Sequence, residues 1–263
     1  MAKRLGVIPH RYAQPVFCRL KERSSTFEVV EDYAASLALK LREKELDGAF
    51  LSPIDYAKEY AMYRIVPNVA VASEGESQSI FVLFKEHLHT IKTLAVDVRS
   101  SSEIVLSHLV FVEKYGTVPQ IIPVVGSFGH AFEKADAVLL VGDAALASAE
   151  KPNKLDLVDE WKDITGMPFV HGMWVARENA FSVAEINTLI ESAQRGATML
   201  DTFSQTTNPN YLERFQYDLN KDAISSLSEF FRMAYYYGVL KDIPDIKFHS
   251  LEGTQASPTI SLN

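Results

Sequence analysis

Polar and titratable side chains follow directly after several apolar runs of this sequence, and these residues have the types needed for binding and acid–base chemistry. His10, Arg11 and Tyr12 follow a first apolar run, and Ser52 follows a later one. Side chains that follow parallel strands gather at one edge of a sheet, where small molecules bind. We therefore expect these four residues to contribute to a ligand site.

Three consecutive serines stand where a helix is predicted to begin. Ser100, Ser101 and Ser102 follow an apolar run and precede an amphipathic one. The unpaired N–H groups and the dipole of a helix start attract a carboxylate, and serine hydroxyls add donors. The alternative is an ordinary helix cap, because Ser100 and Glu103 have the spacing of a capping box.

Other candidates have a structural alternative as well. Asp143 follows an apolar run and either faces the cleft or caps the short segment after it. His171 interrupts an otherwise apolar run, FVHGMWV, where it is either a general base, a hydrogen-bonding partner of the ligand, or a satisfied core histidine. His10 is the second titratable candidate. Tyr12 either donates to an anion or packs with other aromatic rings.

Composition excludes several classes of function. The chain has 263 residues, 47% hydrophobic residues and a formal charge of -8, without a run of Lys and Arg, so nucleic acid is not an expected partner. No apolar stretch is long enough to cross a membrane, and the N-terminal residues do not resemble a secretory signal. The single cysteine excludes an internal disulfide, and no zinc-like spacing occurs, so no metal site is expected. We expect a cytoplasmic protein; its oligomeric state stays open.

Strands and helices alternate along the chain, which predicts an α/β protein with a parallel sheet covered by helices. Helices are predicted, among other places, over Pro15–Arg23, Ile54–Arg64 and Tyr211–Leu219. We predict two lobes with a ligand cleft between them, one formed by residues 1–86 plus 175–263 and the other by 87–174. A single nine-strand sheet is the alternative.

The segment from Asp156 to Arg177 carries much of this interpretation. It begins as a helix with acidic residues near its start, stops at Gly166, and continues as a long apolar strand from Phe169. We expect this strand to be one chain crossing between the lobes, and a segment near Phe84–His89 to be the other. Such crossings often form the floor of a cleft.

Four segments also match a known family. They are VGDAAL (141–146), DLVDEW followed by TGMPFV and WVAR (156–177), SPIDYA (52–57) and the pattern D-x-x-S-x-S (97–102). Together they resemble the menaquinone-biosynthesis proteins of the futalosine pathway, and among these the chorismate dehydratases most. The resemblance extends from about residue 5 to residue 240.

This resemblance implies a type II periplasmic-binding-protein fold used as a cytoplasmic enzyme. The implied enzyme is a carbon–oxygen lyase that dehydrates chorismate, a small dicarboxylate, to a carboxyvinyloxy-benzoate without metal or organic cofactor. Catalysis would consist of positioning and electrostatics, because aromatisation of the ring drives the reaction. The family's polar site positions fall on Ser79, Ser100, Ser102 and Asp143.

The sequence departs from the family pattern on the expected ligand surface. Tyr12 stands where the family has asparagine, His171 where it has an aromatic residue, Gly172 where it has alanine, and Glu103 where it has serine. These departures suit a non-catalytic or diverged paralogue that binds a related small carboxylate, which is the alternative to the lyase. The expected catalytic residues are Tyr12, Ser79 and His171, and the expected substrate-binding residues are His10, Arg11, Ser52, Ser100, Ser101, Ser102 and Asp143.

Overall fold

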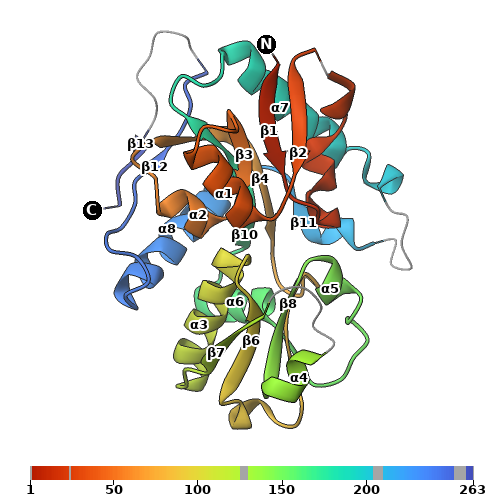
Figure 1. The fold of residues 1–263 in the computed structure, drawn as a ribbon, viewed down its shortest axis with the longest axis vertical. Helices are drawn as coiled ribbons and strands as arrows, with labels where there is room; N and C mark the ends of the chain where they lie inside the picture. The colour runs from red at the N-terminus through yellow and green to blue at the C-terminus, as the bar shows by residue number, and fades with distance from the viewer. Residues whose placement is uncertain (1, 24, 125–129, 204–209, 252–258, 263) are drawn as a thin grey trace.

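The computed structural model describes residues 2–23, 25–124, 130–203, 210–251 and 259–262. Most strands form two sheets, which lie in the upper and lower halves of Figure 1. The six-stranded sheet of the first lobe has the order β11-β4-β10-β3-β1-β2, and the five-stranded sheet of the second lobe has the order β7-β6-β8-β5-β9. The strands of the first sheet are β1 (Lys3–Val7), β2 (Phe27–Glu31), β3 (Gly48–Leu51), β4 (Tyr63–Ser73), β10 (Phe169–Arg177) and β11 (Phe215–Gln216).

The second sheet and the helices complete the two lobes. Its strands are β5 (Ile80–Phe84), β6 (Thr93–Asp97), β7 (Gln120–Val124), β8 (Ala137–Val141) and β9 (Lys154–Asp156). The first lobe carries α1 (Ala34–Arg42), α2 (Pro53–Ala57), α7 (Val183–Ala197) and α8 (Lys221–Tyr236), and the second carries α3 (Ser101–Tyr115), α4 (Ala131–Lys134), α5 (Asp143–Leu146) and α6 (Leu157–Thr165). The short 3-10 helices are η1 (Arg11–Phe17), η2 (Lys21–Arg23), η3 (Leu88–Thr90), η5 (Leu200–Thr202) and η6 (Leu212–Arg214), and β12 (Ile246–Lys247) pairs with β13 (Thr259–Ile260).

The α/β class with separate sheets is confirmed, but the sheets are mixed rather than parallel. In the first sheet β1 pairs in parallel with β2 and β3, whereas β10 is antiparallel to both β3 and β4. The reason lies in the path of the chain. Strand β4 leads out of the first lobe and β10 leads back into it, so their directions are opposite.

The sheet pairings locate the chain crossings. The chain leaves the first sheet after Ser73 and enters the second at Ile80, and it returns through residues 166–168. The crossing predicted near Phe84–His89 is therefore too late, because β5 pairs along its whole length with β8 of the second sheet. An apolar run such as IFVLF fits either sheet equally well, so its sequence does not show which one it joins. The predicted lobe division stays a prediction, and the pairings favour boundaries at 74–79 and 166–168.

Three predicted helices are wrong in type or length. Pro15–Arg23 contains the end of η1 and η2, and Tyr211–Leu219 contains η6 and β11. The helix predicted over Ile54–Arg64 ends at Ala57, and β4 begins at Tyr63. In each case tertiary pairing overrides a local helical pattern; Phe215, for example, pairs with Ser73 at the edge of the first sheet.

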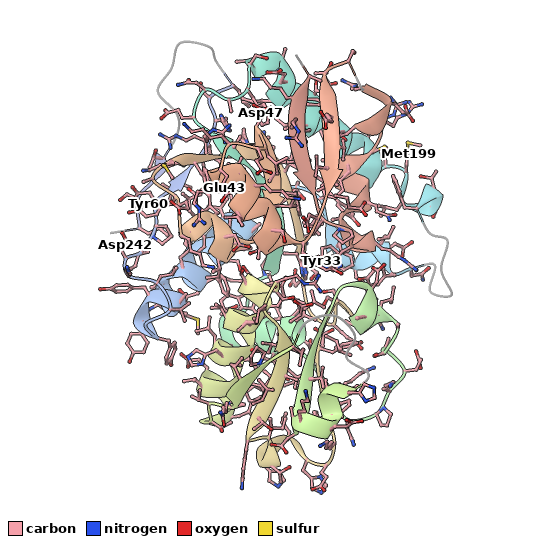
Figure 2. All side chains as sticks on the ribbon, viewed as in Figure 1. Tyr33, Glu43, Asp47, Tyr60, Met199 and Asp242 are labelled. Atoms are coloured by element: carbon pink, nitrogen blue, oxygen red, sulfur yellow. The ribbon has the colours of Figure 1, made fainter. Side chains whose placement is uncertain are left out.

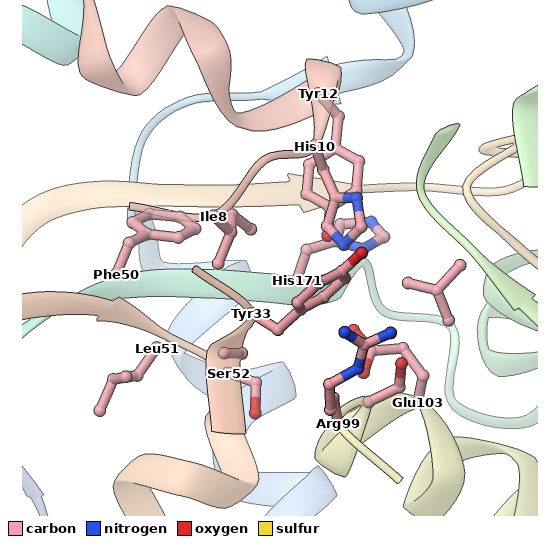
Figure 3. A pocket seen from close by; sticks show the side chains of 13 residues that line it. Ile8, His10, Tyr12, Tyr33, Phe50, Leu51, Ser52, Arg99, Glu103 and His171 are labelled. Carbon is pink, nitrogen blue, oxygen red and sulfur yellow. The ribbon is translucent and has the colours of Figure 1, made fainter. Parts of the chain in front are cut away.

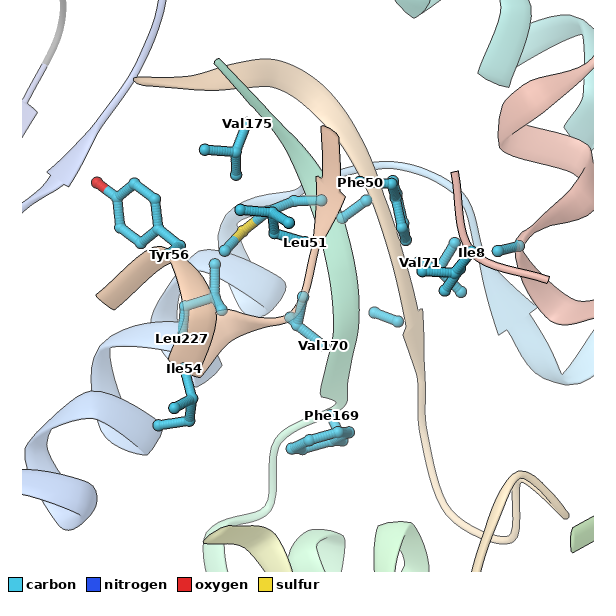
Figure 4. Packing of buried hydrophobic residues seen from close by; sticks show 14 of the residues in the cluster. Ile8, Phe50, Leu51, Ile54, Tyr56, Val71, Phe169, Val170, Val175 and Leu227 are labelled. Atoms are coloured by element: carbon cyan, nitrogen blue, oxygen red, sulfur yellow. The ribbon is translucent and has the colours of Figure 1, made fainter. Parts of the chain in front are cut away.

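Aromatic packing joins the two lobes beside the return crossing. The buried Trp161 ring of α6 meets Phe169 and Phe230 edge-to-face, with centroid separations of 6.2 and 5.7 Å. Its indole N–H donates to the carbonyl of Pro168 and to the Ser226 hydroxyl, both at 3.2 Å. Figure 4 shows how Phe169 and Val170 lead from the second lobe into the core of the first. This packing fixes the starting position of β10.

Asp156 ties the outward crossing to the helix that precedes the return crossing. Its carboxylate accepts the backbone N–H groups of Ser77 and Gln78, at 2.9 and 2.8 Å. It also caps α6 by accepting the N–H groups of Val158 and Asp159, at 2.9 and 3.4 Å. The side chain is buried. One carboxylate therefore holds both connections between the lobes in register.

We expect Asp156→Ala to lower the free energy of unfolding by about 2–4 kcal/mol, because it removes a helix cap and leaves the N–H groups of the outward crossing unpaired. Urea denaturation followed by circular dichroism measures the change. Asp159→Ala, an exposed position on the same helix, is the matched control and should change the free energy by less than about 0.5 kcal/mol. Equal effects of the two substitutions would contradict the bridging role of Asp156.

Candidate functional site

A small pocket lies between the lobes, and both lobes line it (Figure 3). The first lobe contributes His10, Tyr12, Tyr33, Ser52 and His171 among its polar and aromatic lining residues, and the second contributes Arg99, Ser100, Glu103 and Val141. Of the residues predicted from the sequence, His10, Tyr12, Ser52, Ser100 and His171 line this pocket. The chain thus brings together positions that are up to 161 residues apart in the sequence.

Ser79 and Ser101 lie elsewhere. Ser79 is fully buried in the outward crossing, where its hydroxyl bonds to that of Ser77 at 2.7 Å. Ser101 opens α3 but does not line the pocket. Ser79 is not among the pocket-lining residues, and the Ser77–Asp156 network holds the crossing inside the protein, so its ligand contact stays a prediction.

Arg11 and Asp143 pair across the gap between the lobes and do not line the pocket. The Arg11 backbone N–H donates to the Asp143 carboxylate at 3.1 Å, and the guanidinium lies 3.3 Å from the other carboxylate oxygen. Beside them His10 packs against Gly142, where an added Cβ would lie 2.1 Å from the imidazole Nδ1. Gly142 also has φ +61°, which favours glycine. These contacts hold the lobes together.

Ser102 forms a second link between the lobes. Its hydroxyl accepts the N–H of Ile54 and donates to Ser52, both at 2.9 Å, and Ser52 donates to Asp55 at 2.8 Å. Ser102 therefore caps α2 of the opposite lobe. The capping box predicted within α3 is wrong, because Ser100 makes no side-chain cap hydrogen bond. The Glu103 side chain lines the pocket instead.

Arg99 is the arginine of the pocket lining, and its charge is already paired. Its Nε donates to Asp97 at 2.8 Å, its Nη2 to the other carboxylate oxygen at 2.5 Å, and its guanidinium lies 3.6 Å above the Tyr33 ring. Tyr33 lies at the boundary of the lobes in Figure 2. A ligand anion thus meets a cation that Asp97 has largely neutralised.

Three rings in contact form the opposite wall of the pocket; His10 stacks on Tyr12, and His171 is tilted against Tyr12. Tyr12 lies between His10 and His171, with centroid separations of 5.3 and 5.1 Å. Burial lowers the pKa of His10, against an opposing effect of Asp143, and lowers the pKa of His171 to about 3. Burial, then the charge of Glu103, raises the pKa of Tyr12 well above its usual value. All three rings are therefore neutral near pH 7 and offer hydrogen bonds rather than charge.

His171 keeps one ring nitrogen unused. Its Nε2 shares a 2.6 Å hydrogen bond with the Ser73 hydroxyl, and its buried Nδ1 has no partner among the described residues. Whichever nitrogen carries the proton, Nδ1 can give or accept one further hydrogen bond. A buried polar atom without a partner is costly, which favours a ligand contact at this position.

Glu103 lines the pocket although it was not among the site residues predicted from the sequence. Only 6% of the residue is exposed, its carboxyl accepts a hydrogen bond from its own backbone N–H, and it forms no ion pair within the described part of the chain. Burial, and secondarily the charge of Asp55, raises its pKa to about 7. The sequence does indicate that Glu103 lies on the buried face of its helix. Leu106 and Val110, three and seven positions later, share that face and are buried. A carboxylic acid on an apolar helix face is rarely a surface residue.

The lobes are in a closed arrangement. The pocket has a cavity volume of about 20 Å³, which is room for roughly one water molecule. A larger cavity of about 300 Å³ lies on the first lobe beside β1, with Val7, Phe17 and Val29 in its wall, and shares Ile8 with the pocket. The charged residues that line this larger cavity are exposed to solvent, unlike the buried polar groups of the pocket between the lobes. In this arrangement the pocket between the lobes is too small for a ligand with a six-membered ring.

The described residues contain no group of three or more His, Cys, Asp and Glu side chains that could hold a metal ion. No helix in the same part of the chain is long and apolar enough to cross a membrane.

The fold and the interlobe pocket define the class of protein. Two α/β lobes joined by paired crossings are the architecture of periplasmic binding proteins, and solved structures of that fold match this chain. A Candida albicans protein described as having the generic periplasmic-binding-protein fold matches at 11% identity over 92% of each chain, with a TM-score of 0.64. The alkanesulfonate-binding protein of Xanthomonas axonopodis, bound to MOPS, matches at 16% identity over 92% of this chain and 95% of its own, with a TM-score of 0.61.

Within that fold the chain belongs to the menaquinone biosynthesis family, whose model matches residues 3–236. A protein of Archaeoglobus fulgidus is also similar in structure, with a TM-score of 0.72, 20% identity, and coverage of 91% of this chain and 98% of that one. The family resemblance seen in the sequence is confirmed.

The Glu103 carboxyl makes stability depend on pH. Its pKa rises from 4.5 to about 7 on folding, so the folded state holds its proton more tightly and stability falls as the pH rises from about 4.5 through 7. Glu103→Gln removes this titrating group. We therefore expect the change in unfolding free energy that the substitution causes to be more stabilising at pH 8 than at pH 4.5, by about 3 kcal/mol. Urea denaturation at both pH values checks this, with exposed Glu150→Gln as the control. A pH-independent difference between Glu103→Gln and the unchanged protein would contradict it.

Proposed function

We propose that this protein binds a chorismate-like cyclic carboxylate between its lobes and dehydrates it to a carboxyvinyloxy-benzoate. One observation carries the proposal. The helix-start motif of the family and buried polar groups of the other lobe line the same pocket. Ser100 and Glu103 come from the motif's helix, and Tyr12 and His171 face them from the first lobe. Membership of the menaquinone biosynthesis family supports a role in that pathway, and the resemblance to chorismate dehydratases suggests this reaction.

The residues divide into binding and orienting groups. Ser100 and the first N–H groups of α3, a 15-residue helix, can receive a ligand carboxylate, with Arg99 beside them. From the other lobe, the Tyr12 phenol and His171 Nδ1 can hydrogen-bond to a second polar group of the ligand. Loss of water restores aromaticity to the ring, so the protein needs to orient the reacting C–H and C–O bonds more than to activate them.

Closure of the lobes fits this reaction. The links at Arg11–Asp143 and Ser102–Ser52 join the lobes outside and beside the pocket, and can close over a bound ligand. Closure removes bulk water from the pocket, which strengthens hydrogen bonds to the ligand and favours elimination of water over its addition.

A second candidate is a non-catalytic protein that binds a related small carboxylate. It is favoured by the contact between Tyr12 and His171, because both positions depart from the family pattern and their rings lie 5.1 Å apart. Adjacent departures on one wall are the expected result of adaptation to a different ligand. Thermal-shift measurements separate the candidates, since binding raises the melting temperature even without turnover.

Incubation with chorismate tests the lyase directly. We expect mass spectrometry to show a product lighter by one water molecule, and His171→Phe to reduce kcat/KM about tenfold or more, because the ring is kept while Nδ1 is lost. His89→Ala, an exposed histidine of the second lobe, is the control and should leave the rate unchanged.

The proposal fails if purified protein leaves chorismate unchanged under conditions in which another chorismate dehydratase consumes it. In that case a melting-temperature increase with chorismate or with its dehydration product would support the non-catalytic alternative.

A further inference from the structure

Glu103 places a carboxyl group in the pocket without a charged partner. The side chain lines the interlobe pocket, is almost fully buried, accepts a hydrogen bond from its own backbone N–H, and pairs with no cation in the described part of the chain. The nearby Ser102 hydroxyl is used by Ile54 and Ser52, and Arg99 is used by Asp97. A buried carboxyl without such partners costs stability, and a cost of this kind is typical of functional groups.

The groups around Glu103 favour its protonated form. Asp55 of α2 acts on it as a second negative charge, and Tyr12 of η1 is a neutral phenol that interacts with it electrostatically. His10 and His171 on the opposite wall are neutral near pH 7 because burial lowers the pKa of each. Among the described lining residues, the cation Arg99 is directed toward Asp97. Within the described part of the chain, the Glu103 carboxylate is therefore favoured by a hydrogen bond from its own backbone N–H rather than by a neighbouring positive charge.

The opposite wall offers a complementary group. His171 Nδ1 is buried and unpartnered, and it comes from the first lobe, whereas Glu103 comes from the second. A ligand between the lobes is therefore bounded by a carboxyl without a cationic partner on one side and an imidazole nitrogen without a hydrogen-bond partner among the described residues on the other. This is the arrangement that an elimination needs, with a proton donor and a hydrogen-bonding group facing different parts of one small molecule.

We propose that Glu103 is the general acid that protonates the leaving hydroxyl of the substrate; this role rests on the proposed function, the dehydration of a chorismate-like ligand. As the ring C–O bond breaks, the Glu103 carboxyl gives its proton to the departing oxygen, which leaves as water. The electron pair of the neighbouring ring C–H bond forms the new π bond, and a carboxylate of the substrate accepts that proton. Glu103 is left as a carboxylate and is reprotonated from solvent before the next turnover, so no oxidant or reductant takes part.

The assignment explains the departure of position 103 from the family pattern. A serine hydroxyl at this position donates a hydrogen bond but is too weak an acid to deliver a proton near pH 7. The carboxyl of Glu103 can do both. The same group disfavours a ligand carboxylate placed directly against it, so the substrate hydroxyl, rather than an acid group, is expected to face α3 at this point.

The pH dependence of turnover by purified full-length protein tests this role. We expect kcat for chorismate to fall above about pH 7 as Glu103 loses its proton, and Glu103→Gln to lower kcat about 100-fold and remove that fall. Glu103→Asp should keep the pH-dependent fall at a reduced rate. Glu150→Gln, an exposed position in the same lobe, should match the unchanged protein.

A second measurement does not depend on turnover. Infrared difference spectra, the unchanged ligand-free protein minus Glu103→Gln, should show a buried protonated-carboxyl band near pH 6 that weakens toward pH 9; the subtraction removes the contribution of Asp156, whose pKa burial raises to about 6. Absence of this difference band would overturn the acid role whatever the kinetics show.

The outcomes for Glu103 and for the proposed function are distinct. If the unchanged protein converts chorismate but Glu103→Gln does so at the same rate and with the same pH profile, the general-acid role is overturned and the lyase function stands. If the unchanged protein does not convert chorismate, the lyase function is overturned and the acid role in that reaction falls with it, even when the infrared band is present.

Discussion

The structure depends on one buried carboxylate that connects the two passages of chain between the lobes. Asp156 accepts backbone N–H groups from the outward crossing and caps the helix that leads to the return crossing. The return crossing also positions one wall of the pocket, because β10 begins directly after it and carries His171. The same carboxylate contacts the outward crossing and the helix before the return crossing. Any hinge motion of the lobes is therefore expected within these two short crossings.

The pocket is prepared for hydrogen bonding more than for attraction of charge. Arg99 is paired with Asp97, and Arg11 is paired with Asp143 across the gap. His10, Tyr12 and His171 are neutral near pH 7 because they are buried. An anionic ligand must therefore gain its affinity from serine hydroxyls, helix N–H groups and the exchange of existing ion pairs. Such a site discriminates ligands by the placement of donors and acceptors, since each unpaired buried group is costly.

The sequence predicted the scaffold better than the site. The strand Gly48–Leu51 is predicted correctly, and the strand predicted from Phe169 to Val175 extends two residues further in the structure, to Arg177. Pro15–Arg23 and Tyr211–Leu219 are not the predicted helices, since pairing and packing with distant segments decide their conformation. His10 and His171 line the pocket, whereas Ser79 bonds to Ser77 away from it, and the sequence does not show that network. The spacing of Glu103 from Ser100 also fits a helix cap, so the sequence did not single it out as a pocket residue.

The placement of Glu103 has a cost that the proposed role would explain. Serine at a helix start satisfies the backbone and can serve a ligand without any loss of stability, whereas a buried glutamate lowers stability at neutral pH. A functional role for the carboxyl, as we propose, accounts for that cost. Tyr12 and His171 lie on the facing wall, with ring centroids 5.1 Å apart. In the proposed reaction the two walls act on one ligand: neutral rings on one side orient it, and the carboxyl on the other exchanges a proton with it.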